Sequence, residues 1–262
     1  MKKILSLSLF ACLAFLAGCN SPRKSDLEES GMKGKIKQMT ELVNNHVSDS
    51  LFTEDDPTEE KTEYDVMRVL DFYPNGNLKN LRLILQNGTS VQKYLYDKDS
   101  LLTEVQYFEN GRMLSYETYS YNSKGLKESI AVKDTSGALL QTVSLKYDGK
   151  GNKTEQTDIF PGGLKRTQYF KYNDKGQLAE KKVVQNGVST GITEKYHYDE
   201  NGNLSELSSV DTMFDSFTMS QKFHYKEIDS LGNWTYRETE GISSKSTQGK
   251  IIQTWERTIE YY

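Results

Sequence analysis

Three histidines, His46, His197 and His224, are the side chains that could do acid–base or metal chemistry near neutral pH. His197 in "KYHYD" and His224 in "KFHYK" hold similar places in consecutive repeats, about 10 Å apart across one intervening strand. One metal ion cannot span that distance without a carboxylate from the strand between them. We interpret both as solvated histidines on a polar face, and we expect no metal site and no cofactor.

Carboxylates are the other group with catalytic potential. The acidic stretch 54–60, "EDDPTEE", offers oxygen ligands of the kind calcium takes, but it lacks the glycine-punctuated alternation of a calcium loop and contains Pro57. We interpret it as a solvated insertion. No nucleophile elbow, phosphate-cradling loop or His-Glu-x-x-His pair occurs. No carboxylate pair stands out from ordinary cross-strand ion pairs, so we predict that the chain is not an enzyme.

Aromatic side chains are the candidates for ligand binding, because Tyr and Trp rings stack on sugars and anchor protein interfaces. The candidates are Trp234 and Trp255, which fall in the irregular last repeats, and Tyr196 and Tyr198 in a regular one. In the competing interpretation, the tyrosines hold neighbouring strands together and the tryptophans cap the last edge of the sheet. The sequence favours this structural role.

The first residues predict export. Lys2 and Lys3 precede an apolar run too short to span a bilayer, which is typical of a signal peptide over residues 1–18. "LAGC" resembles the lipobox of bacterial lipoproteins, which implies that Cys19 is lipidated and begins the mature chain. The polar segment "NSPRKSDLEESGM" then predicts a flexible tether, so that residues 19–33 form the anchor region.

The mature chain would have no disulfide, because Cys12 leaves with the signal and Cys19 carries lipid. Loss of Lys2 and Lys3 leaves 31 basic against 37 acidic residues, a net charge of −6, which argues against nucleic acid as a partner. Asn20 after the cysteine implies the outer membrane, by resemblance to enterobacterial sorting rules. The tether also lacks the acidic cluster that resembles a surface-export signal, so we expect a periplasm-facing anchor.

A repeat of about 25 residues fills the rest of the chain, as in "KYLYDKDSLLTEV", "FKYNDKGQLAE" and "KYHYDENGNLSELS". Turn signals such as "DENG" alternate with a second set such as Asn186-Gly187, which predicts consecutive β-hairpins. In the first turn type, Asp199 can accept hydrogen bonds from nearby amides and Gly202 can take the left-handed position. Bulky residues two apart, such as Tyr196 and Tyr198, share one face and form an aromatic ladder across the sheet.

The predicted fold is all-β: residues 34–262 form a long antiparallel hairpin meander of about 15 or 16 strands, in a coiled or curled sheet whose closure the pattern leaves open. Hydrophobic residues make up 35% of the chain and tyrosines number 17, which suits a thin sheet with one aromatic face. A membrane β-barrel is the alternative fold for such strands. Its apolar face would be interrupted by Lys127 and Lys153, and a lipid anchor would be redundant.

The Tyr-Asp turns followed by Gly-Asn-Leu resemble the YD repeats of Rhs-type proteins, and "DFYPNGNLK" and "QYFENGRML" also resemble MORN-like repeats. "DSLGNWTYRE" and "ERTIEYY" resemble the closing segment of small YD-repeat lipoproteins from Bacteroidetes. The resemblance covers about residues 34–262 and implies architecture, with little on activity.

These observations favour a lipid-anchored envelope protein with a non-enzymatic binding or scaffolding role. Its expected partners are the membrane, through Cys19, and a glycan or envelope protein. A hydrolase acting on envelope polysaccharide or peptidoglycan with unidentified carboxylates is the alternative. Asp-Ser/Thr-aliphatic triplets also resemble the O-glycosylation sequon of exported Bacteroidetes proteins, and the alternative is that they are simply turn residues. The sites concerned are Ser50, Ser100, Thr212 and Ser230.

Overall fold

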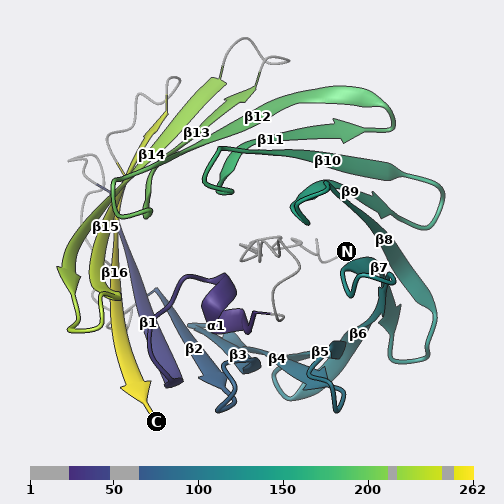
Figure 1. Ribbon diagram of the computed structural model, residues 1–262, viewed down its shortest axis with the longest axis horizontal. Helices are drawn as coiled ribbons and strands as arrows, with labels where there is room; N and C mark the ends of the chain where they lie inside the picture. The colour runs from purple at the N-terminus through teal and green to yellow at the C-terminus, as the bar shows by residue number, and fades with distance from the viewer. Residues whose placement is uncertain (1–23, 48–64, 212–216, 244–250) are drawn as a thin grey trace.

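A computed structural model describes residues 24–47, 65–211, 217–243 and 251–262 of the chain (Figure 1). One short helix, α1 (Asp26–Glu29), precedes sixteen strands. The strands are β1 (Ile36–Val47), β2 (Val66–Phe72), β3 (Leu78–Leu85), β4 (Gly88–Tyr96), β5 (Leu102–Glu109), β6 (Arg112–Tyr121), β7 (Lys127–Asp134), β8 (Leu139–Tyr147), β9 (Lys153–Ile159), β10 (Lys165–Tyr172), β11 (Leu178–Gln185), β12 (Val188–Tyr198), β13 (Leu204–Asp211), β14 (Phe217–Ile228), β15 (Trp234–Ser243) and β16 (Ile251–Tyr261).

The strands form one closed antiparallel barrel in which each strand pairs with its neighbours in sequence. The prediction of an all-β hairpin meander is confirmed, and the prediction of a coiled or curled sheet is corrected, because the sheet closes into a barrel. Twist accumulates at each strand pairing and brings the two ends of a wide sheet together. There β1 pairs with β16, with Met39 opposite Ile259, so the edge groups of both strands find partners. The edge that the tryptophans were expected to cap does not exist.

One rim of the barrel, here named the YD rim, consists of the seven turns at 73–77, 97–101, 122–126, 148–152, 173–177, 199–203 and 229–233. Asp199 shows the common geometry: its amide donates to the carbonyl of Asn203, and its Oδ1 accepts from the Asn203 amide at 2.8 Å. Gly202 has φ +85°, and its amide donates to the Asp199 carbonyl at 3.1 Å. The repeated Asp or Asn and the repeated Gly therefore serve the geometry of the turn, with Tyr73 and Ser100 as the exceptions among these positions.

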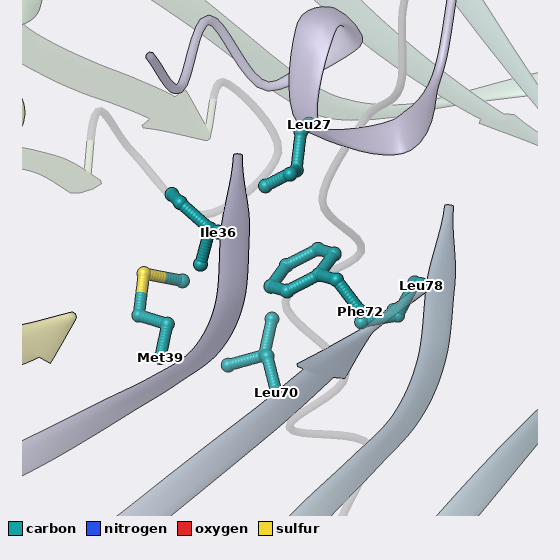
Figure 2. Close-up of a cluster of buried hydrophobic side chains, with 6 residues drawn as sticks. All are labelled: Leu27, Ile36, Met39, Leu70, Phe72 and Leu78. Atoms are coloured by element: carbon teal, nitrogen blue, oxygen red, sulfur yellow. The ribbon is translucent and has the colours of Figure 1, made fainter. Parts of the chain in front are cut away.

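Helix α1 lies inside the ring of strands and shows which face of the sheet is the inner one (Figure 1). Leu27 packs with Met39, Leu70 and Phe72 in a buried cluster that also contains Ile36 and Leu78 (Figure 2). Leu70 and Phe72 occupy the ladder positions of their repeat. The aromatic ladder therefore faces the lumen, and side chains at alternate positions form the outer wall.

The N-terminal end of the described chain is fixed to the YD rim. Ser25 and Glu28 form a capping box on α1, and the Leu27 amide donates to the carbonyl of Gly76 at 3.1 Å. Asp26 Oδ2 accepts from the Tyr96 hydroxyl at 2.7 Å. Residues 24–33, which the sequence pattern places in a flexible tether, are thus folded against the barrel.

The outer wall is strongly charged along most of the barrel. Lys146 pairs with Glu155 at 2.9 Å and Lys171 with Glu180 at 2.9 Å, both across neighbouring strands. Further charged residues at outer positions are Lys93, Glu104, Lys182, Lys195, Lys222, Glu238, Glu240 and Glu256. A lysine facing the middle of a bilayer costs about 2–4 kcal/mol in a β-barrel, so this wall is suited to water. Across the described residues, no helix is long and apolar enough to cross a membrane.

Candidate ligand site at the barrel seam

The seam, defined as strands β14, β15, β16, β1 and β2, holds a compact set of charged and aromatic side chains on the inner face. Register places Glu41 opposite both Arg68 and Arg257, and it places Arg237 opposite Trp255. Strand pairing thus joins residues from both ends of the sequence. We name this set the seam cluster; its members are Glu41, Arg68, Phe223, Tyr225, Trp234, Arg237, Trp255 and Arg257.

Glu41 is the carboxylate at the centre of the cluster and is only 2% exposed. It is 2.7 Å from Arg68 Nη1 and accepts from Arg257 Nε at 2.8 Å. Burial by itself raises the pKa of Glu41, but the charges of Arg68 and Arg257 outweigh it and hold the pKa below its ordinary value. The carboxylate is therefore ionised and already has two cationic partners.

Two guanidinium groups lie against aromatic rings. The Arg257 Cζ is 3.4 Å from the centroid of the Trp234 ring. The Arg237 Cζ lies 4.7 Å from the centroids of both Trp234 and Trp255, and 5.1 Å from that of Phe223. Burial lowers the pKa of both arginines, although both remain charged at neutral pH. The rings lower the cost of holding these cations away from water.

Three buried atoms in this region that can donate a hydrogen bond have no partner among the described residues. They are Arg237 Nε, Trp255 Nε1 and Thr239 Oγ1, and Thr239 is 3% exposed. Glu41 Oε2 also lacks a hydrogen bond of good geometry, but it lies 2.7 Å from Arg68 Nη1. Thr239 is two residues from Arg237 on β15, so both share the inner face. Unpaired buried donors are costly, and each needs an acceptor from water or from a ligand.

The structure brings two of the four predicted ligand-binding residues together. Trp234 and Trp255 both contact Arg237 in the seam cluster, whereas Tyr196 and Tyr198 lie on β12, outside it. The Tyr198 hydroxyl donates to the carbonyl of Leu178 at 2.9 Å, and the Tyr196 hydroxyl donates to Glu194.

The sequence analysis missed Glu41 and the three arginines. A signal was present at Glu41, because it follows Met39 and precedes Val43 on one strand face and so interrupts an apolar alternation. What the sequence could not supply was the pairing of β1 with β16, which joins Glu41 to Arg257.

Other carboxylates face the lumen, each with its own partners. Glu117 accepts from Tyr107 and Tyr119, Asp158 from Gln156 and Gln168, and Glu194 pairs with Lys181 at 2.7 Å. They stand on β6, β9 and β12, so neighbours are about 14 Å apart around the wall at the usual strand spacing. That separation exceeds the roughly 9.5 Å limit of paired carboxylates in glycosidases.

The remaining predicted residues lie elsewhere. His197 is exposed on the outer wall, and His224, also on that wall, is 3.7 Å from Glu240. Ser100 and Ser230 lie in YD-rim turns. Cys19, Ser50, Thr212 and the stretch 54–60 lie outside the described residues, as does the side chain of His46. Within the described ranges, no group of three or more His, Cys, Asp or Glu side chains is placed to hold a metal ion.

No protein-family model and no curated protein matches the sequence. Among solved structures, the chain is similar to a porin-like protein from Bacteroides uniformis, with a TM-score of 0.55 and 11% identity over 86% of this chain and 96% of that one. This likeness concerns the barrel fold alone. A TcdB2-TccC3 structure without its hypervariable C-terminal region gives a TM-score of 0.36 at 12% identity, over 80% of this chain and 11% of that one, which is too low to support a conclusion.

Proposed function

We propose that the chain is a lipid-anchored envelope protein whose barrel stands in water and binds a ligand inside its lumen, without catalysis. The observation that supports this most directly is the polarity of the wall. Charged pairs such as Lys146 with Glu155 face outward, whereas tyrosines and hydrogen-bonding side chains face inward. A barrel that crosses a bilayer needs the opposite arrangement on its outer face.

The lumen offers room and contacts for a ligand. Barrels of sixteen strands enclose more space than their inner side chains fill. Inner side chains such as Tyr119, Leu145 and Tyr196 are only partly buried. Aromatic rings beside hydrogen-bonding groups are the combination that recognises sugars and peptides. A glycan or a peptide segment of an envelope protein is therefore the ligand class that we propose.

Binding is tested by immobilising the full chain, passing envelope extract over it and identifying retained proteins and glycans by mass spectrometry. Tyr196→Ala alters the lumen, and Tyr169→Ala is the matched control, because Tyr169 is 44% exposed and faces outward on β10. We expect Tyr196→Ala to reduce retention and Tyr169→Ala to leave it unchanged. Folded protein that retains nothing contradicts the proposal, and so does equal loss in both variants.

The anchor and the lack of catalysis need separate measurements. Cys19→Ala should move the protein from the membrane to the soluble fraction, and the intact mass of the wild-type chain should show added acyl groups. The proposed location is the outer membrane, facing the periplasm. Hydrolysis of an envelope polymer that disappears on changing one lumen carboxylate, such as Glu117→Gln, would overturn the non-enzymatic role.

A further inference from the structure

The charges of the seam cluster do not balance among the described residues. Three guanidinium groups, those of Arg68, Arg237 and Arg257, share the inner face with one carboxylate, Glu41. Arg68 and Arg257 both contact Glu41, at 2.7 and 2.8 Å. Arg237 has aromatic rings and the Tyr225 hydroxyl as neighbours but no carboxylate of its own. A buried cation without a counter-ion is a place where an anion binds favourably.

The hydrogen-bonding groups near Arg237 point to the same conclusion independently. Arg237 Nε, Trp255 Nε1 and Thr239 Oγ1 are buried and unpartnered in the described parts of the chain. Two of these are N–H groups that can only donate, and the hydroxyl can donate as well. One acceptor with several lone pairs could accept hydrogen bonds from these three groups, and an oxyanion is such an acceptor.

From these two observations we propose that Arg237, Trp255 and Thr239 bind an oxyanion, a carboxylate or phosphate carried by the ligand in the lumen. This inference rests on the proposed function, because it names the part of the ligand that the barrel recognises. Guanidinium groups lie over both indole rings: those of Arg257 and Arg237 are 3.4 and 4.7 Å from the Trp234 centroid, and that of Arg237 is 4.7 Å from the Trp255 centroid. These ring positions are already used by cations, so the proposed mode of recognition is the charge of the ligand and not the stacking of a neutral sugar.

The two tryptophans make the site directly observable. The chain contains two tryptophans in all, and both contact Arg237. Intrinsic tryptophan fluorescence of the full chain thus reports on the seam cluster alone. Titrations with glucuronate, inorganic phosphate and glucose, at constant ionic strength set with sodium chloride, separate a carboxylate from a phosphate and both from a neutral sugar.

We expect a saturable fluorescence change with glucuronate or phosphate and none with glucose. Arg237→Gln should weaken binding by roughly tenfold or more, the effect of losing a charge-assisted hydrogen bond. Arg82→Gln is the matched control, because Arg82 faces outward on β3 and pairs with Asp71 at 3.5 Å. Arg237→Lys keeps the charge, so it tests the site if the glutamine variant does not fold, as judged by circular dichroism.

Three results would overturn the oxyanion site. The first is no saturable response from folded protein, which would mean that only water binds these donors; the second is equal binding of glucose and glucuronate; the third is equal weakening of binding by Arg82→Gln and Arg237→Gln. All three are distinct from a failure of the proposed function, which the retention experiment tests. If extract components still bind through Tyr196 while the tryptophans do not respond, the lumen binds its ligand elsewhere. If nothing is retained and yet glucuronate saturates the fluorescence, the oxyanion site stands without the envelope partner.

Discussion

The seam and the regular wall opposite it, β4 to β12, differ in how charged side chains on the inner face find partners. Along the regular wall, inner charges such as Lys181 and Lys153 have partners on neighbouring strands: Lys181 pairs with Glu194, and Lys153 lies 4.4 Å from the centroid of the Phe170 ring. At the seam, Glu41 and Arg257 are 216 residues apart in sequence, and three guanidinium groups surround one carboxylate. In the repeats, charged and polar side chains find their partners on the neighbouring strands. Closure of the barrel depends instead on contacts that occur only once in the chain.

This difference in side-chain partners also suggests different roles: the contacts of the regular wall stabilise the barrel, and those of the seam are suited to binding a ligand. In the regular wall, ladder hydroxyls such as that of Tyr172 on β10 donate to a carbonyl on the neighbouring strand, in this case that of Lys153 on β9 at 2.8 Å. Those bonds hold the strands in register and leave little unsatisfied. The seam keeps unpaired donors and extra positive charge, which a purely structural contact would not retain. Binding groups are therefore to be sought where the repeat pattern breaks.

Removal of the Glu41 charge should have the largest effect. In Glu41→Gln, Arg68 and Arg257 lose their counter-ion in a buried site, so we expect the free energy of unfolding to fall by about 3–5 kcal/mol. Urea denaturation followed by circular dichroism measures it. Glu194→Gln is the control in the regular wall, where Lys181 keeps partial access to solvent, and it should cost about 1 kcal/mol. Equal losses would remove the distinction between the two regions.

Acid should weaken the seam in particular. The pKa of Glu41 is held below its ordinary value of 4.5 in the folded chain, so its contribution to stability is present above pH 4.5 and is lost as pH falls through the lowered folded value. The stability difference between wild-type and Glu41→Gln should be constant near neutral pH and shrink below about pH 4. Urea denaturation across this range measures it, and a difference that does not change with pH would contradict the ion-pair account.

Much of the fold was predictable, because the residues within one repeat determine its turns and the two faces of its strands. "DENG" defines a turn through Asp199 and Gly202, and the alternation of Tyr196, His197 and Tyr198 defines two faces. Closure was not predictable from such signals. Whether sixteen strands coil or close depends on the accumulated twist and on pairing between β1 and β16, which no local pattern encodes.

The candidate site was predictable only in part. Trp234 and Trp255 stand out because they interrupt the repeat, and both lie in the seam cluster. Arg237 looks like an ordinary alternating strand charge until the inner face is known, whereas Glu41 interrupts an apolar alternation but has no partner that the sequence identifies. A charge on the inner face costs far more than one on the outer wall, and the sequence does not state which face is inner.

A smaller effect is expected from the rim glycines. Gly176 has φ +77° and open space around the position of a Cβ, so Gly176→Ala should cost about 1–2 kcal/mol through backbone strain alone. Gly149 lies in an equivalent rim turn without a positive φ and also has open space, so Gly149→Ala is the matched control and should be close to neutral. Thermal denaturation compares them, and equal melting temperatures would show that the rim turns are not strained.

The smallest effects should reveal how each region distributes its energy. Tyr121→Phe and Tyr172→Phe each remove one hydroxyl that donates to a carbonyl, at 2.7 and 2.8 Å, and each should cost about 1 kcal/mol. They stand four strands apart, about 19 Å, so the double variant should lose the sum of the two. Glu41→Gln with Arg257→Gln should instead lose less than the sum, because the second change removes a charge that the first left unpaired. Coupling between the two tyrosines as strong as that within the seam would mean that the barrel responds as one unit, and that the repeat wall is not locally satisfied.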